Sequence, residues 1–400
     1  MKRAWLFVFL LSVVGCLNYL DRIMITTMRS SILESIPMTD AQFGLLTSVF
    51  LWVYGVLSPV GGFLADRFKR STVIICSLLI WSTVTWMTSL ATTFQELLIT
   101  RALMGASEAC YIPAALAFIV DYHRGKTQSL AVGIHMAGVI IGQALGFLGG
   151  WMAENYTWDF AFHFFGLFGV AYAIVLFFIL KDAPPVKAPT TLVAQTNKIN
   201  FLGAIANLFS YKGFLIAWCF WGLFSISGWL IIGWLPTYYK EHFELSQTTS
   251  GLYATGYLYS ASLAGVLIGG FLADKYSKNF SRARILVPAV GLLVAAPCIY
   301  LASTTSLLAV AIGGFMLYAF MRAFSDANMM PILCLVTEEK YRATGYGVLN
   351  FFGCLIGGGG LYVGGVLRDM SINLSGMFVL ASFTTLISGF LLLFIKERKY

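Results

Sequence analysis

The chain has 400 residues, of which 58% are hydrophobic and 11% are charged, far fewer than the roughly 25% charged residues of an average soluble domain. A soluble protein of this length has no interior large enough for so much apolar surface, so the composition excludes a soluble enzyme or binding domain and indicates a protein that faces lipid. The formal net charge of +8 lies in short clusters between apolar runs, which argues against a nucleic-acid-binding surface.

Twelve apolar runs follow one another along the chain, and about 20 apolar residues are enough to cross a bilayer as a helix. The runs lie at about 4–26, 40–65, 72–91, 95–121, 127–152, 158–181, 211–239, 248–274, 283–302, 305–336, 340–367 and 373–395. The first run resembles a signal peptide, but no small-residue cleavage site precedes its polar NYLDR segment, so we interpret it as a retained helix. The sequence predicts an all-α membrane protein with twelve transmembrane helices.

The basic residues are distributed unequally between the two sides of the predicted membrane protein. With the N-terminus placed in the cytoplasm, 20 of the 26 Lys and Arg residues fall in inner loops and tails. The other six are the outer Arg29, Lys240 and Arg368 and the intramembrane Arg22, Arg101 and Arg322. This asymmetry follows the positive-inside rule and predicts that both termini are cytoplasmic.

The string GGFLAD occurs at 61–66 and again at 269–274, an offset of 208 residues, and a basic cluster follows each copy. Glu108 and Asp326 share an offset of 218, and His135 and Asn350 share an offset of 215. Repeats at this spacing predict two pseudo-symmetric six-helix bundles, at 1–181 and 210–400. The Pro-containing polar segment 182–209 between them is predicted to be a cytoplasmic linker that ends in a short surface helix.

The first copy, GGFLADRFKR, resembles the signature of the loop between helices 2 and 3 of the major facilitator superfamily, G-x-x-x-D-R-x-G-R-R, with Lys69 in place of the second glycine. Arg101 and Gly105 are similar to the R-x-x-x-G signature that this family associates with proton coupling. The resemblance implies the major facilitator fold and secondary active transport by alternating access.

Two subfamilies are compatible with the remaining motifs. NYLDR, RALMGASEACYIPA and WLPTYY resemble the anion:cation symporters, which move organic acids and sugar acids. NYLDR and the spacing from Arg101 to Glu108 also resemble Spinster-type transporters of lysolipids. Pro113 and WLPTYY favour the first, so the expected function is symport of a small organic anion with a proton, with sodium as the alternative coupling ion. A Spinster-like transporter of a lysolipid or other amphiphile is the alternative function.

Ionisable groups within the membrane are costly and usually mark a function or a pair. Glu108, Asp21 and Arg101 are the candidate proton-coupling residues. Arg101 and Glu108 lie seven residues apart and therefore on one helix face, and Arg101 is expected to reach Asp21 if the first and fourth helices are neighbours. A substrate carboxylate and an acidic side chain would then compete for one cation. The alternative interpretation is a set of static ion pairs.

The candidate substrate-binding residues begin with Arg22 and Arg322, because a guanidinium group binds a carboxylate in a bidentate way. Arg322 and Asp326 are spaced i, i+4 and are expected to pair. The other candidates are Asn18, Tyr19, His135, Asn350, Trp229, Tyr253 and Tyr257. Packing is the alternative role for His135, and anchoring at the membrane interface is the alternative role for the aromatic residues.

The repeated string supplies a candidate conformational latch made of Gly62, Asp66, Arg67, Arg70 and Asp274. Glycine permits close helix approach, and an acid at the inner tip of a helix is able to bind a neighbouring helix N-terminus or a basic side chain. We expect the latch to close the inner side when the central cavity faces outward. Packing of a glycine at a helix end is the alternative interpretation.

Other classes of membrane protein find little support. The sequence contains no HExxH, GxSxG or P-loop pattern, so neither an enzyme nor a cofactor or metal site is expected. A channel would need a continuous polar pore, whereas the charges cluster at mid-depth in each half. The predicted partners are an anionic small molecule, a coupling ion and the lipid bilayer. We expect a multi-pass monomer in the plasma (inner) membrane.

Overall fold

The computed structural model describes residues 2–123, 127–183, 201–280, 282–338 and 341–396. Within these residues, twelve helical segments are long and apolar enough to cross a membrane, one for each predicted run. The first six spans are formed by α1 (Lys2–Thr27), α3 (Asp40–Arg67), α4 (Arg70–Thr88), α5 (Phe94–Glu108) with α6 (Tyr111–Tyr122), α7 (Gln128–Ala144) with α8 (Phe147–Asn155), and α9 (Trp158–Ile179). The short helix α2 (Arg29–Ser35) lies between the first and second spans.

The later spans follow the helix α10 (Phe201–Ser210), which occupies the place predicted for a short helix at the end of the linker. Residues 184–200 of that linker lie outside the described part of the chain. The elements are α11 (Lys212–His242), α12 (Gln247–Gly251), the π-helical turn η1 (Leu252–Tyr257), α13 (Leu258–Ser277), α14 (Ala283–Thr304), α15 (Leu308–Val336), α16 (Arg342–Asp369) and α17 (Leu374–Phe394).

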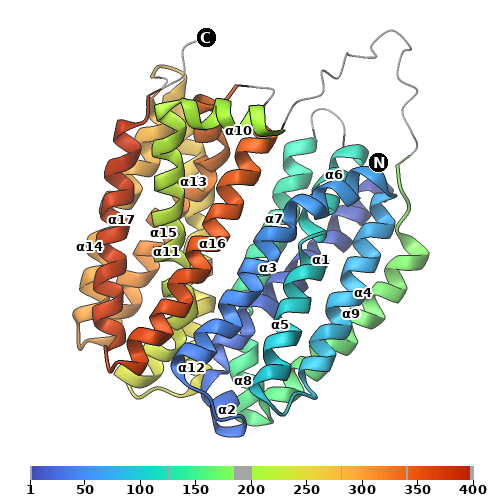
Figure 1. Ribbon diagram of the computed structural model, residues 1–400, viewed down its shortest axis with the longest axis vertical. Helices are drawn as coiled ribbons and strands as arrows, with labels where there is room; N and C mark the ends of the chain where they lie inside the picture. Colours follow the sequence, from blue (N-terminus) through green and yellow to red (C-terminus); the bar gives the residue numbers. More distant parts are fainter. Residues whose placement is uncertain (1, 124–126, 184–200, 281, 339–340, 397–400) are drawn as a thin grey trace.

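Figure 1 shows two helical bundles side by side, one formed by α1–α9 and the other by α11–α17. The start of α1 and the end of α17 lie at one end of the molecule, here called the terminal end, and α2 and α12 lie at the other, here called the distal end. The placement of the terminal end in the cytoplasm stays a prediction from the distribution of basic residues.

The two bundles meet along α3 and α16, where glycines let the helix backbones approach closely. A Cβ atom at Gly44 would lie 2.8 Å from the carbonyl oxygen of Leu361, which leaves no room for a side chain. The hydroxyl of Ser48 donates to the carbonyl of Gly358 at 2.6 Å, and the indole of Trp52 donates to that of Leu355 at 3.0 Å. Small residues and interhelical hydrogen bonds are what hold helices together in lipid.

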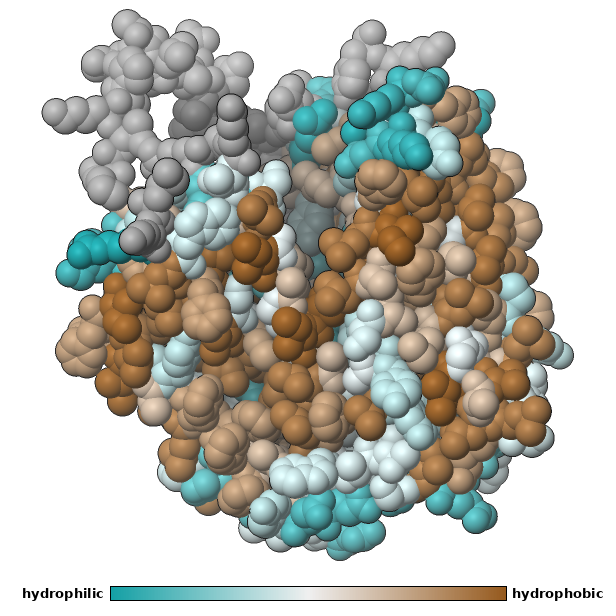
Figure 2. Space-filling model, turned by 180° about the vertical axis from the view of Figure 1, so that it is seen from behind, coloured by the Kyte–Doolittle hydropathy of each residue, from teal (hydrophilic) through white to brown (hydrophobic). Residues whose placement is uncertain are grey.

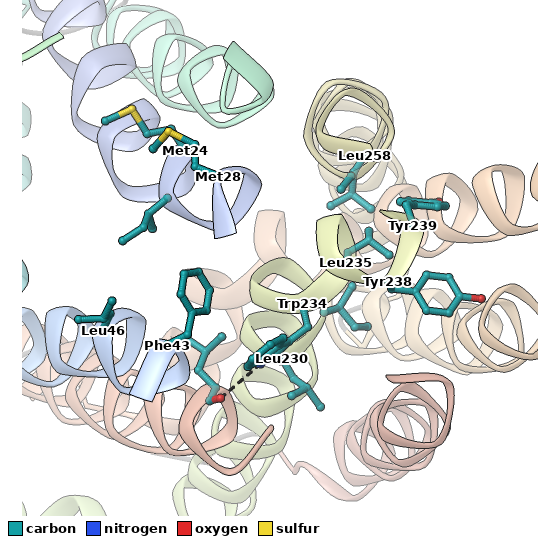
Figure 3. Close-up of a cluster of buried hydrophobic side chains, with 14 of the residues drawn as sticks. Met24, Met28, Phe43, Leu46, Leu230, Trp234, Leu235, Tyr238, Tyr239 and Leu258 are labelled. Atoms are coloured by element: carbon teal, nitrogen blue, oxygen red, sulfur yellow. Dashed lines mark hydrogen bonds between the residues drawn. The ribbon is translucent and has the colours of Figure 1, made fainter. Parts of the chain in front are cut away.

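The hydrophobic cores differ between the two ends. One core combines residues of both bundles, among them Met24 and Met28. Figure 3 shows Phe43 of the first bundle beside Trp234 of α11, with the two rings centred 6.1 Å apart. The other main cores each belong to a single bundle, for example around Phe118 in the first and around Phe220 in the second. Figure 2 shows a recess between the bundles that opens at the terminal end. The molecule is therefore closed at the distal end and open at the terminal end.

Candidate functional site

Arg22 of α1 lies at the centre of a buried polar cluster in the first bundle. Its Nη2 atom lies 2.8 Å from Oε2 of Glu108 on α5 and donates more weakly, at 3.4 Å, to Oδ1 of Asn18. Three aromatic rings surround the guanidinium group, with Tyr19 centred at 4.3 Å and both Phe50 and Tyr54 at 4.7 Å. Arg22 is thus held by one carboxylate and by π-faces rather than by water.

In this conformation Arg101 and Asp21 are close enough to interact electrostatically, but they do not form a direct ion pair. Arg101 is 1% exposed, yet among the described residues it forms no ion pair within 4.0 Å, and its Nη1 contacts only the sulfur of Met104 at 3.1 Å. Asp21 instead accepts a hydrogen bond from the hydroxyl of Thr85 at 3.2 Å. The ring of Phe50, 4.8 Å from the guanidinium of Arg101, lies against both arginines. The cation that Glu108 binds is therefore Arg22, on the same helix as Asp21.

The second bundle holds the predicted Arg322–Asp326 pair on α15, with Nη1 and Oδ2 at 3.0 Å. Phe224 and Gly228 of α11 lie beside this pair. The Arg322 guanidinium is 3.9 Å from the centre of the Phe224 ring and lies against the backbone at Gly228. The two side chains keep 18% and 34% of their surface exposed, whereas those of Arg22 and Glu108 keep 3% and 0%. Arg322 is therefore the more accessible of the two arginines.

Tyr19 connects the two polar groups across the midline. It is close enough to interact electrostatically with Tyr54 of its own bundle and with Tyr259 and Tyr346 of the other. Tyr259 in turn interacts electrostatically with Arg322. Tyrosines from α1, α3, α13 and α16 thus converge between the two bundles, as expected for a central binding region.

On the eighth span, the predicted Tyr253 and Tyr257 differ in position from Tyr259, which the sequence did not single out. Tyr253 and Tyr257 lie in η1, where Tyr253 contacts Tyr239 and Tyr257 is 41% exposed. Tyr259, two residues further, faces the opposite side of the helix and is 6% exposed beside the central group. A π-helical turn holds one residue more than an α-helical turn, so it shifts which residues face inward. Trp229 lines a small cavity with Arg22 and Arg101. Its role in substrate binding stays a prediction.

His135 does not join this site. Its side chain is fully buried within the first bundle, packed on the backbone at Gly15 and against the ring of Tyr111, whose centre lies 5.9 Å away. This environment fits the packing interpretation. Asn350, its counterpart in the repeat, is half-buried on α16.

The repeated string has a different packing residue from the one expected. A Cβ atom at Gly62 would meet nothing within 4 Å, whereas one at Gly61 would clash with the backbone of Ala109 and Cys110. The second copy agrees: a Cβ at Gly269 would lie 2.7 Å from Phe324, and one at Gly270 no closer than 3.8 Å to any atom. The first glycine of each copy is therefore the packing residue.

The acids of the two copies lie at the terminal end. Asp66 is exposed and forms no ion pair with any described residue, and Asp274 lies 3.6 Å from Arg284 in its own bundle. Arg67 contacts the ring of Phe63, and Arg70 pairs with Asp121. No contact of these residues crosses between the bundles in the described structure, which is expected if the latch is open in this conformation.

Four charged residues at the distal end form a closed group that we call the distal ring: Arg29 and Asp40 of the first bundle, and Glu241 and Arg368 of the second. Arg29 binds Asp40 and, at 3.4 Å, Glu241. Arg368 binds Asp40 at 3.0 Å and Glu241 through two hydrogen bonds of 2.9 Å. Each acid therefore contacts an arginine from each bundle. Asp369 strengthens the closure, since it accepts hydrogen bonds from the N–H groups of Asp40 and Ala41 at the start of α3.

The distal ring was not predicted from the sequence, in which its arginines count only as outer basic residues. A signal was present, because Arg29 and Arg368 are two of the three basic residues assigned to the outer side, where the positive-inside rule disfavours them. Basic residues on the side that the positive-inside rule disfavours commonly have a specific acidic partner.

The Major Facilitator Superfamily model matches residues 11–361 of the chain. Among curated proteins, Protein spinster homolog 1 of Xenopus tropicalis is 26% identical over 388 residues, which cover 90% of this chain and 72% of that protein. The Hexuronate transporter of Bacillus subtilis is 23% identical over 94% of this chain and 90% of its own length.

A crystal structure of a bacterial homologue of the human lysosomal transporter Spinster, in an inward-facing and unoccupied conformation, has the same fold. Its TM-score is 0.78 and its sequence identity 22%, over 98% of this chain and 95% of that one. At this identity the likeness is one of fold.

Proposed function

Because the chain belongs to the major facilitator superfamily, we propose that it carries a small organic anion, such as a sugar acid or another carboxylate, together with a proton by alternating access. The chain is a multi-pass membrane transporter and not an enzyme. The substrate, the coupling ion and the location in the plasma (inner) membrane belong to the proposal.

The observation that carries the proposal is the buried pair of Arg22 and Glu108. Both side chains lie out of contact with water, and the guanidinium group of Arg22 has one carboxylate partner among the described residues, at 2.8 Å. A buried charge without a partner is strongly unfavourable. A substrate carboxylate that binds Arg22 would displace Glu108, which would then keep its electrostatic interaction with Arg101 but no ion pair, so that its neutralisation is favoured. A proton taken up by Glu108 neutralises it, so anion and proton bind together.

Arg322 provides the first contact for the anion. It is the more exposed arginine, and its partner Asp326 is still more exposed, so a substrate entering the recess reaches this pair before the buried cluster. The tyrosines between Arg322 and Arg22 offer hydroxyl donors and ring faces along the way. Closing the terminal end and opening the distal ring would then release the site to the other side.

Uptake into proteoliposomes tests the proposal. Purified protein is reconstituted with an imposed pH gradient, and accumulation of radiolabelled hexuronates and simple carboxylates is measured with and without a protonophore. Accumulation that requires the pH gradient and is lost in Glu108→Gln supports proton symport. Accumulation that follows a sodium gradient and ignores pH would refute the choice of proton.

A Spinster-like transporter of an anionic lysolipid is the second candidate function. Relatives with Spinster names favour it, since they match about nine-tenths of this chain. The phosphate of such a lipid would also bind Arg22 or Arg322, so the polar head would use the same site. Transfer of a fluorescent lysophospholipid by the reconstituted protein, with no carboxylate uptake, would decide for this function.

A further inference from the structure

A groove runs along the lipid-facing side of the first bundle, between the end of α3 and the neighbouring helices α4 and α5. Its rims are formed by large side chains, among them Phe68 and Ile80, and its floor by small ones, among them Ala106. α4 and α5 are joined beside the groove, where the hydroxyl of Ser77 donates to the carbonyl of Ser107 at 2.6 Å.

The groove continues at the terminal end into a polar pocket between α4 and α9. Thr72 and Cys76 line both, and the pocket adds Lys69, Lys181 and Asp182. Both lysines are exposed and have no ion-pair partner among the described residues. The carboxylate of Asp182 is already engaged by the start of α4, where it accepts a hydrogen bond from the N–H of Ser71 at 3.0 Å. The pocket therefore presents two lysines without an ion-pair partner among the described residues beside one carboxylate, so its charged side chains carry a net positive charge.

The dimensions suit one lipid leaflet. From Thr72 to Val84 the groove follows twelve residues of α4, which at 1.5 Å per residue is about 18 Å. Half of a bilayer's hydrocarbon core is about 15 Å thick. An acyl chain lying in the groove would therefore place its headgroup beside Lys69 and Lys181.

The second bundle contains a matched groove. Leu272 and Tyr276 line it, and they stand 208 residues after Leu64 and Phe68, which line the first groove. None of the described residues that line this second groove is charged. Pseudo-symmetry thus explains an apolar groove at this place in each bundle, and basic residues follow both copies of the repeat. In the first bundle, Lys69 and Lys181 line a pocket that shares Thr72 and Cys76 with the groove.

We propose that the groove on the first bundle, together with Lys69 and Lys181, binds an anionic phospholipid of the surrounding bilayer. The phosphate group lies between the two lysine ammonium groups and one acyl chain lies over Ala106. Each lysine near an anionic lipid surface contributes roughly a five-fold factor in affinity. This site is independent of the transported substrate, because it faces lipid on the outside of the bundle rather than the central recess.

Native mass spectrometry with added lipid tests this proposal. Purified protein in a neutral detergent is titrated with phosphatidylglycerol or with phosphatidylcholine of the same chains. We expect phosphatidylglycerol to be retained at least ten-fold more strongly, and the Lys69→Gln/Lys181→Gln variant to lose most of this preference. The matched control Lys275→Gln/Lys278→Gln changes the basic residues after the second copy of the repeat and is expected to bind like the unmodified protein.

A second variant examines the acyl-chain part of the site. Ala106→Phe fills the floor of the groove without changing any charge, and it is expected to weaken binding several-fold while the protein stays monodisperse. Equal retention of both lipids, unchanged binding in the double lysine variant, an equal loss in the matched control, or full binding by Ala106→Phe would each overturn the proposal.

Discussion

Arg368 on α16 and Asp40 on α3 form a 3.0 Å ion pair that joins the two bundles at the distal end. Arg368 also holds Glu241, so one side chain connects an acid of each bundle. The guanidinium groups of Arg29 and Arg368 lie 5.8 and 5.5 Å from the centre of the Trp234 indole. The distal ring thus contacts the apolar core that contains Trp234. The distal ring therefore stabilises the arrangement that is open at the terminal end.

Arg368→Gln is expected to favour opening of the distal end. Partly exposed pairs contribute up to about 1 kcal/mol each, so loss of the pairs to Asp40 and Glu241 shifts the two-state ratio by roughly five- to thirty-fold. A cysteine at position 237, on a background without native cysteines, reports the change, because Thr237 is buried and lines a pocket at this end. Faster labelling by a water-soluble maleimide is the expected result, and an unchanged rate would contradict a gating role.

Glu108→Gln is expected to abolish accumulation driven by a pH gradient while counterflow exchange persists. Glutamine resembles the protonated acid, so the variant carries substrate without needing to bind or release a proton. Asp326→Asn is the comparison, because it also neutralises an acid paired with an arginine, but in a more exposed place. Full gradient-driven accumulation by Glu108→Gln would remove Glu108 as the proton carrier.

Arg22→Lys and Arg322→Lys test which arginine binds the substrate's negative charge. Lysine keeps the charge but loses the planar guanidinium fork. Hydrogen bonds to charged groups contribute about 1.5–3 kcal/mol, so at least one variant is expected to lose ten-fold or more in affinity, measured as ligand-dependent thermal stabilisation. Wild-type affinity in both variants would show that the anion is recognised elsewhere.

Asp66→Asn tests the proposed latch at the terminal end. If Asp66 and Asp274 close this end in the other conformation, the variant is expected to populate the terminal-open state more and to transport more slowly, with substrate affinity within a few-fold of normal. A latch worth about 1 kcal/mol changes the ratio of states about five-fold. Cysteine labelling in the recess measures it, with Glu34→Gln at the distal end as the control. Equal labelling in both variants would leave the repeated string as a packing motif.

Gly44→Ala is expected to lower the thermal stability of the protein and to weaken the contact between the bundles. The new methyl group would lie 2.8 Å from the carbonyl oxygen of Leu361, so α3 and α16 would have to move apart. Gly359→Ala is the matched control, since a Cβ at that position meets nothing within 4 Å. A melting temperature of Gly44→Ala equal to that of the control would show that the contact between α3 and α16 tolerates a side chain at this position.

Much of the fold could be predicted from the sequence because the bilayer imposes its dimensions on the chain. Each span needs a run of apolar residues as long as the hydrocarbon core is thick, so the twelve runs correspond to twelve helical spans. The Arg322–Asp326 pair was predictable for a similar reason, since four residues of one helix always return to the same face.

The tertiary structure decided everything that depends on how one helix is rotated against another. Glu108 pairs with Arg22, 86 residues away, and not with the arginine of its own helix, because the arrangement of the helices in the first bundle brings those two side chains together. Asp40 and Arg368 are 328 residues apart and meet only because the bundles close at the distal end. Tyr259 is 6% exposed whereas Tyr257 is 41% exposed, a difference that no hydrophobic period in the sequence reveals. Composition and periodicity describe each helix alone, whereas the site is formed by contacts between helices.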